Sequence, residues 1–206
     1  MILITGAARS GTSLTTGMLQ RLGAYLGRPQ DINDLNENVA IRQNILKPYL
    51  RSIGADPLGQ SVIAPPEAVK LRPGLREDVE AVFADGPQPW AYKDAKITLC
   101  WQAWAEAFPD AIWVIVRRDA EKIVDSCIRT KFMRHYGDDR DGWMGWVRAH
   151  EERFEAMKAA GLDFIEVWQR DVAADIKAFR PVAEHCGLPF DAAKAGAGFN
   201  PTLWNG

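Results

Sequence analysis

The sequence lacks an excess of charge of either sign. Its 206 residues include 25 Lys and Arg against 27 Asp and Glu, for a formal net charge of −2. This balance gives no electrostatic reason to expect binding to nucleic acid or to an anionic membrane surface. Any cationic site in this protein must therefore be local.

Cysteines are few, and long apolar runs and internal repeats are absent. Cys100, Cys127 and Cys186 lie far apart without metal-ligand spacing, so we expect reduced, packed thiols. No apolar run approaches the roughly 20 residues that a membrane-spanning helix needs. The opening MILIT is too short for a signal peptide and leads directly into a glycine-containing loop. We therefore expect a cytoplasmic protein.

Apolar residues make up 47% of the chain, and short strand-like runs alternate with helical patterns. The patterns predict strands over 2–5, 89–93, 111–116 and 163–168. They predict helices over 12–22, 36–54, 73–84, 97–108, 119–134, 143–159 and 172–186, an irregular segment over 55–71, and a tail with little periodicity. The helix over 36–54 is expected to be bent or interrupted near Pro48. This alternation predicts a single α/β domain over 1–206, a three-layer P-loop-like fold with a mainly parallel central sheet flanked by helices.

The segment GAARSGTS lies between the first predicted strand and the helix that follows it. It matches the phosphate-loop pattern G-x-x-x-x-G-K-[ST] at Gly6, Gly11 and Ser13, but Thr12 stands where that pattern has lysine. In this context the loop N–H groups and the helix N-terminus converge on an anion. Arg9 offers a cation in place of the missing lysine. A tight turn that binds nothing is the alternative.

A second cationic motif follows the predicted strand IWVIV. Arg117 and Arg118 stand where a magnesium-dependent NTPase usually has an aspartate. Asp119 is a plausible N-cap, and Ser126, nearly two turns later, shares its side of the helix, away from the apolar stripe. Arg118 and Ser126 are thus placed to bind a second phosphate. A solvated arginine and an ordinary surface serine are the alternative.

Together, ARSGTS (8–13) and WVIVRRDAEKIVDS (113–126) resemble the two cofactor motifs of the PAPS-dependent sulfotransferases, where PAPS is 3′-phosphoadenosine 5′-phosphosulfate. Weaker similarities, NEN (36–38), YKDAK (92–96) and QRDVAAD (169–175), extend the resemblance along the chain. The resemblance implies transfer of a sulfuryl group from PAPS to a hydroxyl or amine of a small-molecule or carbohydrate acceptor. It also implies that adenosine 3′,5′-bisphosphate is released and that no metal is needed.

The resemblance implies that the first motif holds the 5′-phosphosulfate and that Arg118 and Ser126 hold the 3′-phosphate. It places Arg9 beside the transferring group, and Lys93 is a further candidate there. For Lys93, a side chain that extends from a strand end to solvent is the alternative. The first-motif residues are Ala8, Arg9, Ser10, Gly11, Thr12 and Ser13.

The general base of the cytosolic branch of this family is a histidine two residues after a lysine, where this chain has Ala95. Glu37 is the candidate base instead, because some relatives use a glutamate. A first-turn carboxylate that stabilises the helix dipole is the alternative for Glu37. His135 is the second candidate, and His150 and His185 rank below it, because each lies on a predicted helix where a solvated side chain is the alternative.

Leu14 and Gln169 stand where other family members carry tryptophan and tyrosine, so the adenine contacts are unassigned. Segments 28–88 and 132–148 are predicted acceptor-side insertions. Neither the acceptor nor the oligomeric state follows from the sequence. Two other functions remain open: a divergent P-loop kinase for a small molecule, which Thr12 and the absence of an aspartate after IWVIV disfavour, and a nucleotide-binding protein without turnover.

Overall fold

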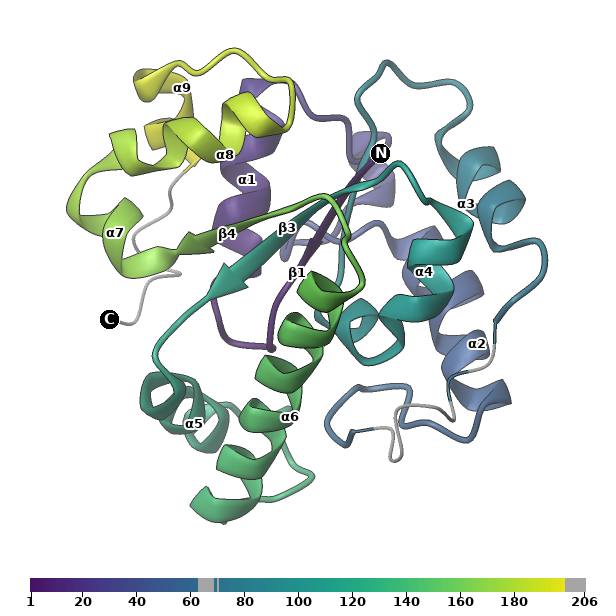
Figure 1. The fold of residues 1–206 in the computed structure, drawn as a ribbon, viewed down its shortest axis with the longest axis vertical. Helices are drawn as coiled ribbons and strands as arrows, with labels where there is room; N and C mark the ends of the chain where they lie inside the picture. The colour runs from purple at the N-terminus through teal and green to yellow at the C-terminus, as the bar shows by residue number, and fades with distance from the viewer. Residues whose placement is uncertain (63–68, 70, 199–206) are drawn as a thin grey trace.

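Within residues 1–62, 69 and 71–198, which the computed structural model describes, a parallel sheet of four strands runs through the middle of the molecule (Figure 1). The strands are β1 (Ile2–Thr5), β2 (Ala91–Lys93), β3 (Ile112–Arg117) and β4 (Phe164–Trp168). Their order is β2-β1-β3-β4, and β1 pairs with both β2 and β3. The predicted α/β class with a parallel central sheet is therefore confirmed.

Helices connect the strands and cover the sheet. The α-helices are α1 (Thr12–Leu22), α2 (Lys47–Ser52), α3 (Leu75–Phe83), α4 (Trp101–Ala107), α5 (Ala120–Arg129), α6 (Arg140–Ala159), α7 (Gln169–Ala174), α8 (Arg180–His185) and α9 (Ala192–Gly198). A π-helical segment over Ile41–Leu46 precedes α2, and 3₁₀ turns cover Pro29–Asp31, Ala95–Cys100 and Ile176–Phe179.

Side chains from alternate positions of the strands are buried on opposite faces of the sheet, which makes three layers. In β1, Leu3 packs in a cluster with residues of α2, α3, α4 and α6. Ile2 and Ile4 pack on the other face with residues of α1, α8 and α9. Burial on both faces explains why the strands are short apolar runs rather than alternating ones.

Three predicted helices are irregular, and for one of them a bend or interruption near Pro48 was expected. The helix predicted over 36–54 is π-helical before α2, in which Pro48 lacks an N–H to donate to the preceding turn. The helix predicted over 97–108 begins as a 3₁₀ turn, capped by the Asp94 carboxylate, which accepts the Lys96 N–H. The helix predicted over 172–186 is interrupted at Asp175, whose carboxylate accepts the Lys177 N–H. In two of these cases an aspartate side chain accepts a backbone N–H at the start of a 3₁₀ turn.

The tail, predicted without regular structure, contains α9, which packs against α1. A Cβ atom placed on Gly198 would lie 2.7 Å from the carbonyl oxygen of Gly17, so the two backbones meet through glycines. Small residues allow this packing without an apolar stripe, which is why the sequence pattern missed the helix. The predicted irregular segment has no helix or strand over 55–62; residues 63–68, 70 and 199–206 lie outside the described part of the chain.

The parallel arrangement brings four chain segments to one edge of the sheet. The carboxyl ends of parallel strands all lie at the same edge, which is where open α/β sheets bind ligands. The loop from Gly6 leaves β1 there, Asp94 follows β2, Arg118 follows β3, and Gln169 follows β4. These segments therefore meet, although they are spread over most of the sequence.

Cys100, Cys127 and Cys186 are free thiols in the interior. Burial raises the pKa of each thiol to about 12, so all three are held in the unreactive protonated form.

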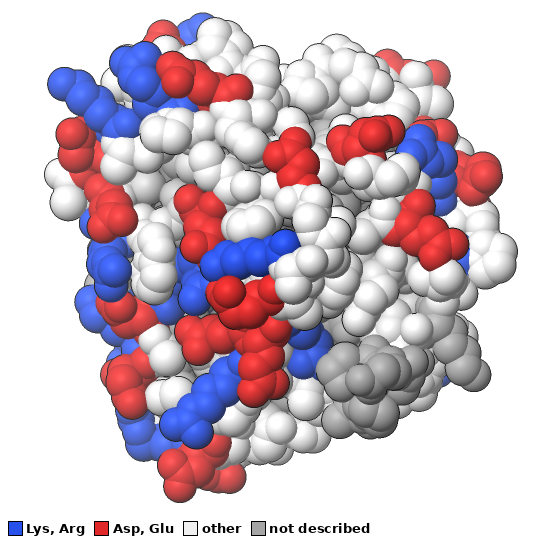
Figure 2. Space-filling model, in the orientation of Figure 1, with Lys and Arg blue, Asp and Glu red and all other residues white. Residues whose placement is uncertain are grey.

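Figure 2 shows Lys and Arg interspersed with Asp and Glu on one face of the molecule. None of the described helices combines the length and apolar composition needed to cross a bilayer.

Candidate active site

The loop between β1 and α1 has a conformation that depends on glycine at two positions. A Cβ at Gly6 would lie 2.5 Å from the carbonyl oxygen of Val116, and one at Gly11 would lie 2.8 Å from Cγ of Gln169. Gly11 also has φ of 101°, and Arg9 adopts the left-handed region with φ of 75°. The loop is thus packed tightly against the ends of β3 and β4, and Arg9 is turned toward α5.

The loop and the start of α1 retain groups suited to an anion. No side chain caps the N-terminus of α1, and its first turn has no acidic residue. Ser10 is fully buried, and its Oγ has no hydrogen-bond partner among the described residues. A buried hydroxyl and helix N–H groups left without a side-chain acceptor are what a phosphate or sulfate oxygen needs. The loop residues therefore fit an anionic group.

Direct contacts connect the two sequence motifs. The Arg9 Nε donates to Ser126 Oγ at 2.9 Å, and Arg118 Nη1 donates to the Arg9 carbonyl oxygen at 2.9 Å. Ser126 is only 2% exposed, so the alternative of an ordinary surface serine is wrong: this side of α5 faces the loop. Asp119 occupies the N-cap position of α5 without capping it, because its carboxylate accepts from Arg170 Nη1 at 2.8 Å.

Cationic groups gather around these contacts. Burial, followed by the nearby guanidinium groups of Arg9 and Arg129, lowers the pKa of Arg118. Within the described ranges, no carboxylate forms an ion pair with Arg9. Neighbouring like charges destabilise one another, and a multivalent anion between them would relieve that repulsion.

A pocket of about 120 Å³ opens beside the loop and brings six of the predicted site residues together. Ala8, Arg9, Thr12 and Ser13 line one part of it, and Glu37 and Lys93 line another. Arg118 and Ser126 are outside the lining and reach the loop through Arg9.

Glu37 is held by a set of directed contacts at the pocket floor. Its Oε1 accepts from Lys93 Nζ at 3.1 Å, and its Oε2 accepts from Asn33 Nδ2 at 3.1 Å and lies 3.3 Å from Arg42 Nε. Burial alone would raise the pKa of Glu37, but the nearby cations Lys93, Lys96 and Arg42 outweigh burial and lower it. Glu37 is therefore ionised at neutral pH.

The asparagines around Glu37 fix its segment to the rest of the site. The Asn36 Nδ2 donates to the Ser13 carbonyl oxygen at 3.0 Å, and Asn38 Nδ2 donates to the Leu26 carbonyl oxygen at 3.0 Å. The Asn38 Oδ1 also accepts the Ile41 N–H at 3.1 Å, at the start of the π-helical segment. Helical residues begin at Val39, so Glu37 lies before the first turn, and the interpretation of Glu37 as a first-turn carboxylate was wrong.

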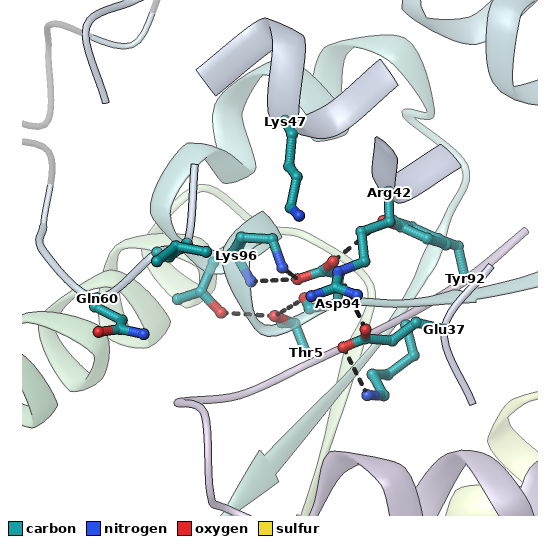
Figure 3. A network of polar contacts seen from close by, with 12 residues as sticks. Thr5, Glu37, Arg42, Lys47, Gln60, Tyr92, Asp94 and Lys96 are labelled. Carbon is teal, nitrogen blue, oxygen red and sulfur yellow. Dashed lines mark hydrogen bonds and ion pairs between the residues drawn. The ribbon is translucent and has the colours of Figure 1, made fainter. Parts of the chain in front are cut away.

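Lys93 pairs with Glu37 in a buried charged network that the sequence interpretation covered only in part. Figure 3 shows Glu37, Asp94 and Lys96 in this network. Lys93 is 3% exposed, so it does not extend to solvent, and burial lowers its pKa against the opposing effect of Glu37 and Asp94. The fully buried Asp94 pairs with Lys96 Nζ at 2.7 Å. In Figure 3, Lys47 points from α2 toward this network. The segment YKDAK contains Asp94 and Lys96, so a search for paired charges within it would have found both.

The histidines are placed differently from the expectation. His135 is exposed, its ring packs edge-on against Tyr136, and it does not line the pocket. His150 does line the pocket and is buried, so the alternative of a solvated side chain is wrong for His150. Burial lowers the pKa of His150 to about 4, and its Nδ1 lies 2.8 Å from the Trp146 carbonyl oxygen. His185 pairs with Asp163 on the surface.

Both predicted insertions contribute to the wall of the pocket. Leu35, Leu58 and Gln60 come from segment 28–88, and Phe132 and Trp146 come from segment 132–148. Among the described residues, no group of three or more His, Cys, Asp or Glu side chains is placed to hold a metal ion.

Comparisons with known proteins give one family match and two similar crystal structures. The sequence model of the Sulfotransferase family matches residues 2–192. The crystal structure of sulfotransferase STF9 from Mycobacterium avium aligns with a TM-score of 0.60 and 15% identity over 98% of this chain and 67% of that chain. Sulfotransferase STF1 from Mycobacterium tuberculosis H37Rv aligns with a TM-score of 0.52 and 16% identity over 96% of this chain and 70% of that chain. At these identities the likeness shows a shared fold. No curated protein sequence gives a significant match.

Proposed function

The chain belongs to the sulfotransferase family, and from this premise we propose that it transfers a sulfuryl group from PAPS to a hydroxyl or amine of a small-molecule or carbohydrate acceptor. One observation carries the proposal: the loop after β1 and the motif after β3 are joined through Arg9, which contacts Ser126 and Arg118. A loop of this shape with arginines around it suits a donor that brings two phosphate groups.

The described residues fit PAPS at both of its charged ends. The loop N–H groups, Thr12 and Ser13 would bind the 5′-phosphate, beside the uncapped start of α1. Arg118 and Ser126 would bind the 3′-phosphate. Ser126 accepts the bond from Arg9, so its own O–H is left to donate to a phosphate oxygen.

PAPS, when bound, supplies an activated sulfuryl group, whose S–O bond to the 5′-phosphate breaks as the acceptor oxygen attacks the sulfur. Arg9 and the loop stabilise the charge that grows on the departing phosphate oxygen. Lys93, which lines the pocket, would donate to the sulfuryl oxygens. When Lys93 makes that contact, Glu37 Oε1 loses one donor and becomes a better acceptor for the proton of the attacking hydroxyl.

The test begins with nucleotide binding, measured as a thermal shift. We expect adenosine 3′,5′-bisphosphate at about 100 times its Kd to stabilise the protein by roughly 2.7 kcal/mol. ATP with magnesium serves as the comparison, because a P-loop kinase would prefer it. Stabilisation by ATP–magnesium alone would rule out the proposed donor.

Turnover is measured separately, by supplying PAPS together with a broad panel of alcohols, phenols, sugars and amines. Formation of a sulfated product supports the proposal. Binding of the bisphosphate without transfer to any member of the panel would indicate a nucleotide-binding protein without turnover.

A further inference from the structure

Large apolar side chains gather at the mouth of the active-site pocket. Among the described residues, five large apolar side chains are exposed: Leu35 (39%), Val39 (37%), Leu58 (51%), Leu71 (52%) and Phe132 (51%). Three of them, Leu35, Leu58 and Phe132, line this one pocket. They come from three separate stretches of the chain, so their meeting is a property of the fold. We call these three side chains the apolar rim.

Hydrogen bonds from two buried side chains, Gln60 and Trp146, hold the stretches that carry Leu58 and Phe132 in place. Gln60, which is 4% exposed, donates from Nε2 to the carbonyl oxygen of Phe132 at 2.6 Å. The Trp146 Nε1 donates to the Gly59 carbonyl oxygen at 3.2 Å, next to Leu58. The stretches that carry Leu58 and Phe132 are thus fastened to each other and to α6 while both side chains remain in contact with water. Such a fixed, exposed apolar cluster beside a pocket is typical of a ligand contact.

The floor of the same pocket is polar, but its charged groups already pair with one another. Glu37 contacts both Lys93 and Arg42, and Asp94 contacts Lys96. Because these charged groups already have partners, the floor offers few unpaired groups to the polar atoms of an incoming molecule. The pocket therefore combines a small polar end with an apolar entrance.

We propose that the acceptor is an amphipathic alcohol or phenol, with its hydroxyl group at Glu37 and Lys93 and its apolar body against Leu35, Leu58 and Phe132. This inference rests on the proposed function and narrows its acceptor class. A free sugar has hydroxyl groups on every side, and several would face the apolar rim without a hydrogen-bond partner. That loss disfavours a sugar relative to an apolar alcohol.

The test compares three asparagine variants. Leu58→Asn and Phe132→Asn change the rim, whereas Leu71→Asn changes an equally exposed leucine that does not line this pocket. Each variant and the unmodified protein are titrated calorimetrically with 2-naphthol and with methyl β-glucoside, both with and without adenosine 3′,5′-bisphosphate. Because the three side chains are about half exposed, the variants should fold, and thermal unfolding checks this.

We expect 2-naphthol to bind the unmodified protein more tightly than methyl β-glucoside. Each rim variant should raise the Kd for 2-naphthol roughly tenfold, and Leu71→Asn should leave it unchanged. The Kd for the bisphosphate should be the same in all four proteins. Tighter binding of methyl β-glucoside, no binding of 2-naphthol, or equal 2-naphthol affinity in rim and control variants would overturn the proposal.

The titrations separate this inference from the proposed function. Failure of the bisphosphate to bind any of the proteins would count against the proposed donor. The titrations of 2-naphthol without bisphosphate would still decide whether the rim recognises an apolar alcohol. Normal bisphosphate binding with no effect of the rim variants would count against the acceptor class alone.

Discussion

Replacing His150 with glutamine is expected to remove part of the acid sensitivity of this protein. His150 is 1% exposed within α6, and burial lowers its pKa from 6.5 to about 4. The unfolded chain takes up a proton on this residue near pH 6.5, whereas the folded protein resists protonation until about pH 4. The free energy of unfolding therefore contains a contribution from neutral His150 that is fully present above pH 6.5 and is lost as the pH falls toward 4.

The size of the effect follows from the two pKa values. Each pKa unit corresponds to about 1.36 kcal/mol, so His150 accounts for roughly 3 kcal/mol once the pH is below 4. Between pH 7 and pH 5 the loss amounts to about 2 kcal/mol, because most of the unfolded chains are protonated at pH 5 and few folded molecules are. That is a measurable share of the stability of a typical domain.

Urea unfolding at pH 7 and pH 5 measures the loss in the free energy of unfolding. The proteins are the unmodified chain, His150→Gln, and His135→Gln as a matched control, since His135 is exposed. We expect the unmodified chain and the control to lose about 2 kcal/mol more than His150→Gln over this interval. Glutamine keeps an N–H donor, so the contact with the Trp146 carbonyl oxygen has a replacement. Equal losses in all three proteins would refute the reasoning.

Two further predictions concern the proposed donor site and base. Arg118→Ala should raise the Kd for adenosine 3′,5′-bisphosphate by roughly ten- to a hundredfold, which is the loss expected for a charge-assisted hydrogen bond. The control Arg180→Ala removes an exposed arginine on α8 and should leave this Kd unchanged. Calorimetry measures both, and an unchanged Kd in Arg118→Ala would contradict the assignment of the 3′-phosphate site. Glu37→Gln should leave the bisphosphate Kd unaltered and lower kcat for sulfuryl transfer by roughly a hundredfold or more. If this variant turned over at the normal rate, Glu37 would not be the base.

Local patterns predicted some elements to the residue. The bounds of β1 and α1 agree with the sequence prediction, because an apolar run ends at Gly6 and a helical stripe begins after Gly11. Irregular turns were harder to predict. The π-helical segment before α2 and the break at Asp175 depend on which backbone groups find side-chain partners, and apolar periodicity carries no information on that choice.

The candidate site was predictable in part, because some of its features are local in the sequence. The glycine spacing of the loop, its missing lysine and the arginines after IWVIV are local features, and they indicated an anion site before any fold was known. The roles assigned to Arg9, Glu37 and Lys93 stay predictions. Their meeting in one pocket, and the place of His150 in its wall, required contacts between segments far apart in the sequence.

The sequence by itself determined the kind of chemistry to expect, because loop glycines, charged residues and strand periodicity are short-range properties. Only the tertiary structure decided that Ser126 is buried against Arg9 and that Glu37 forms ion pairs with both Lys93 and Arg42. It also decided which apolar side chains stay exposed beside the pocket. Burial, pKa shifts and rim contacts all depend on which distant segments become neighbours. Parallel strands bring those segments to one edge of the sheet, and their order in the chain does not reveal it.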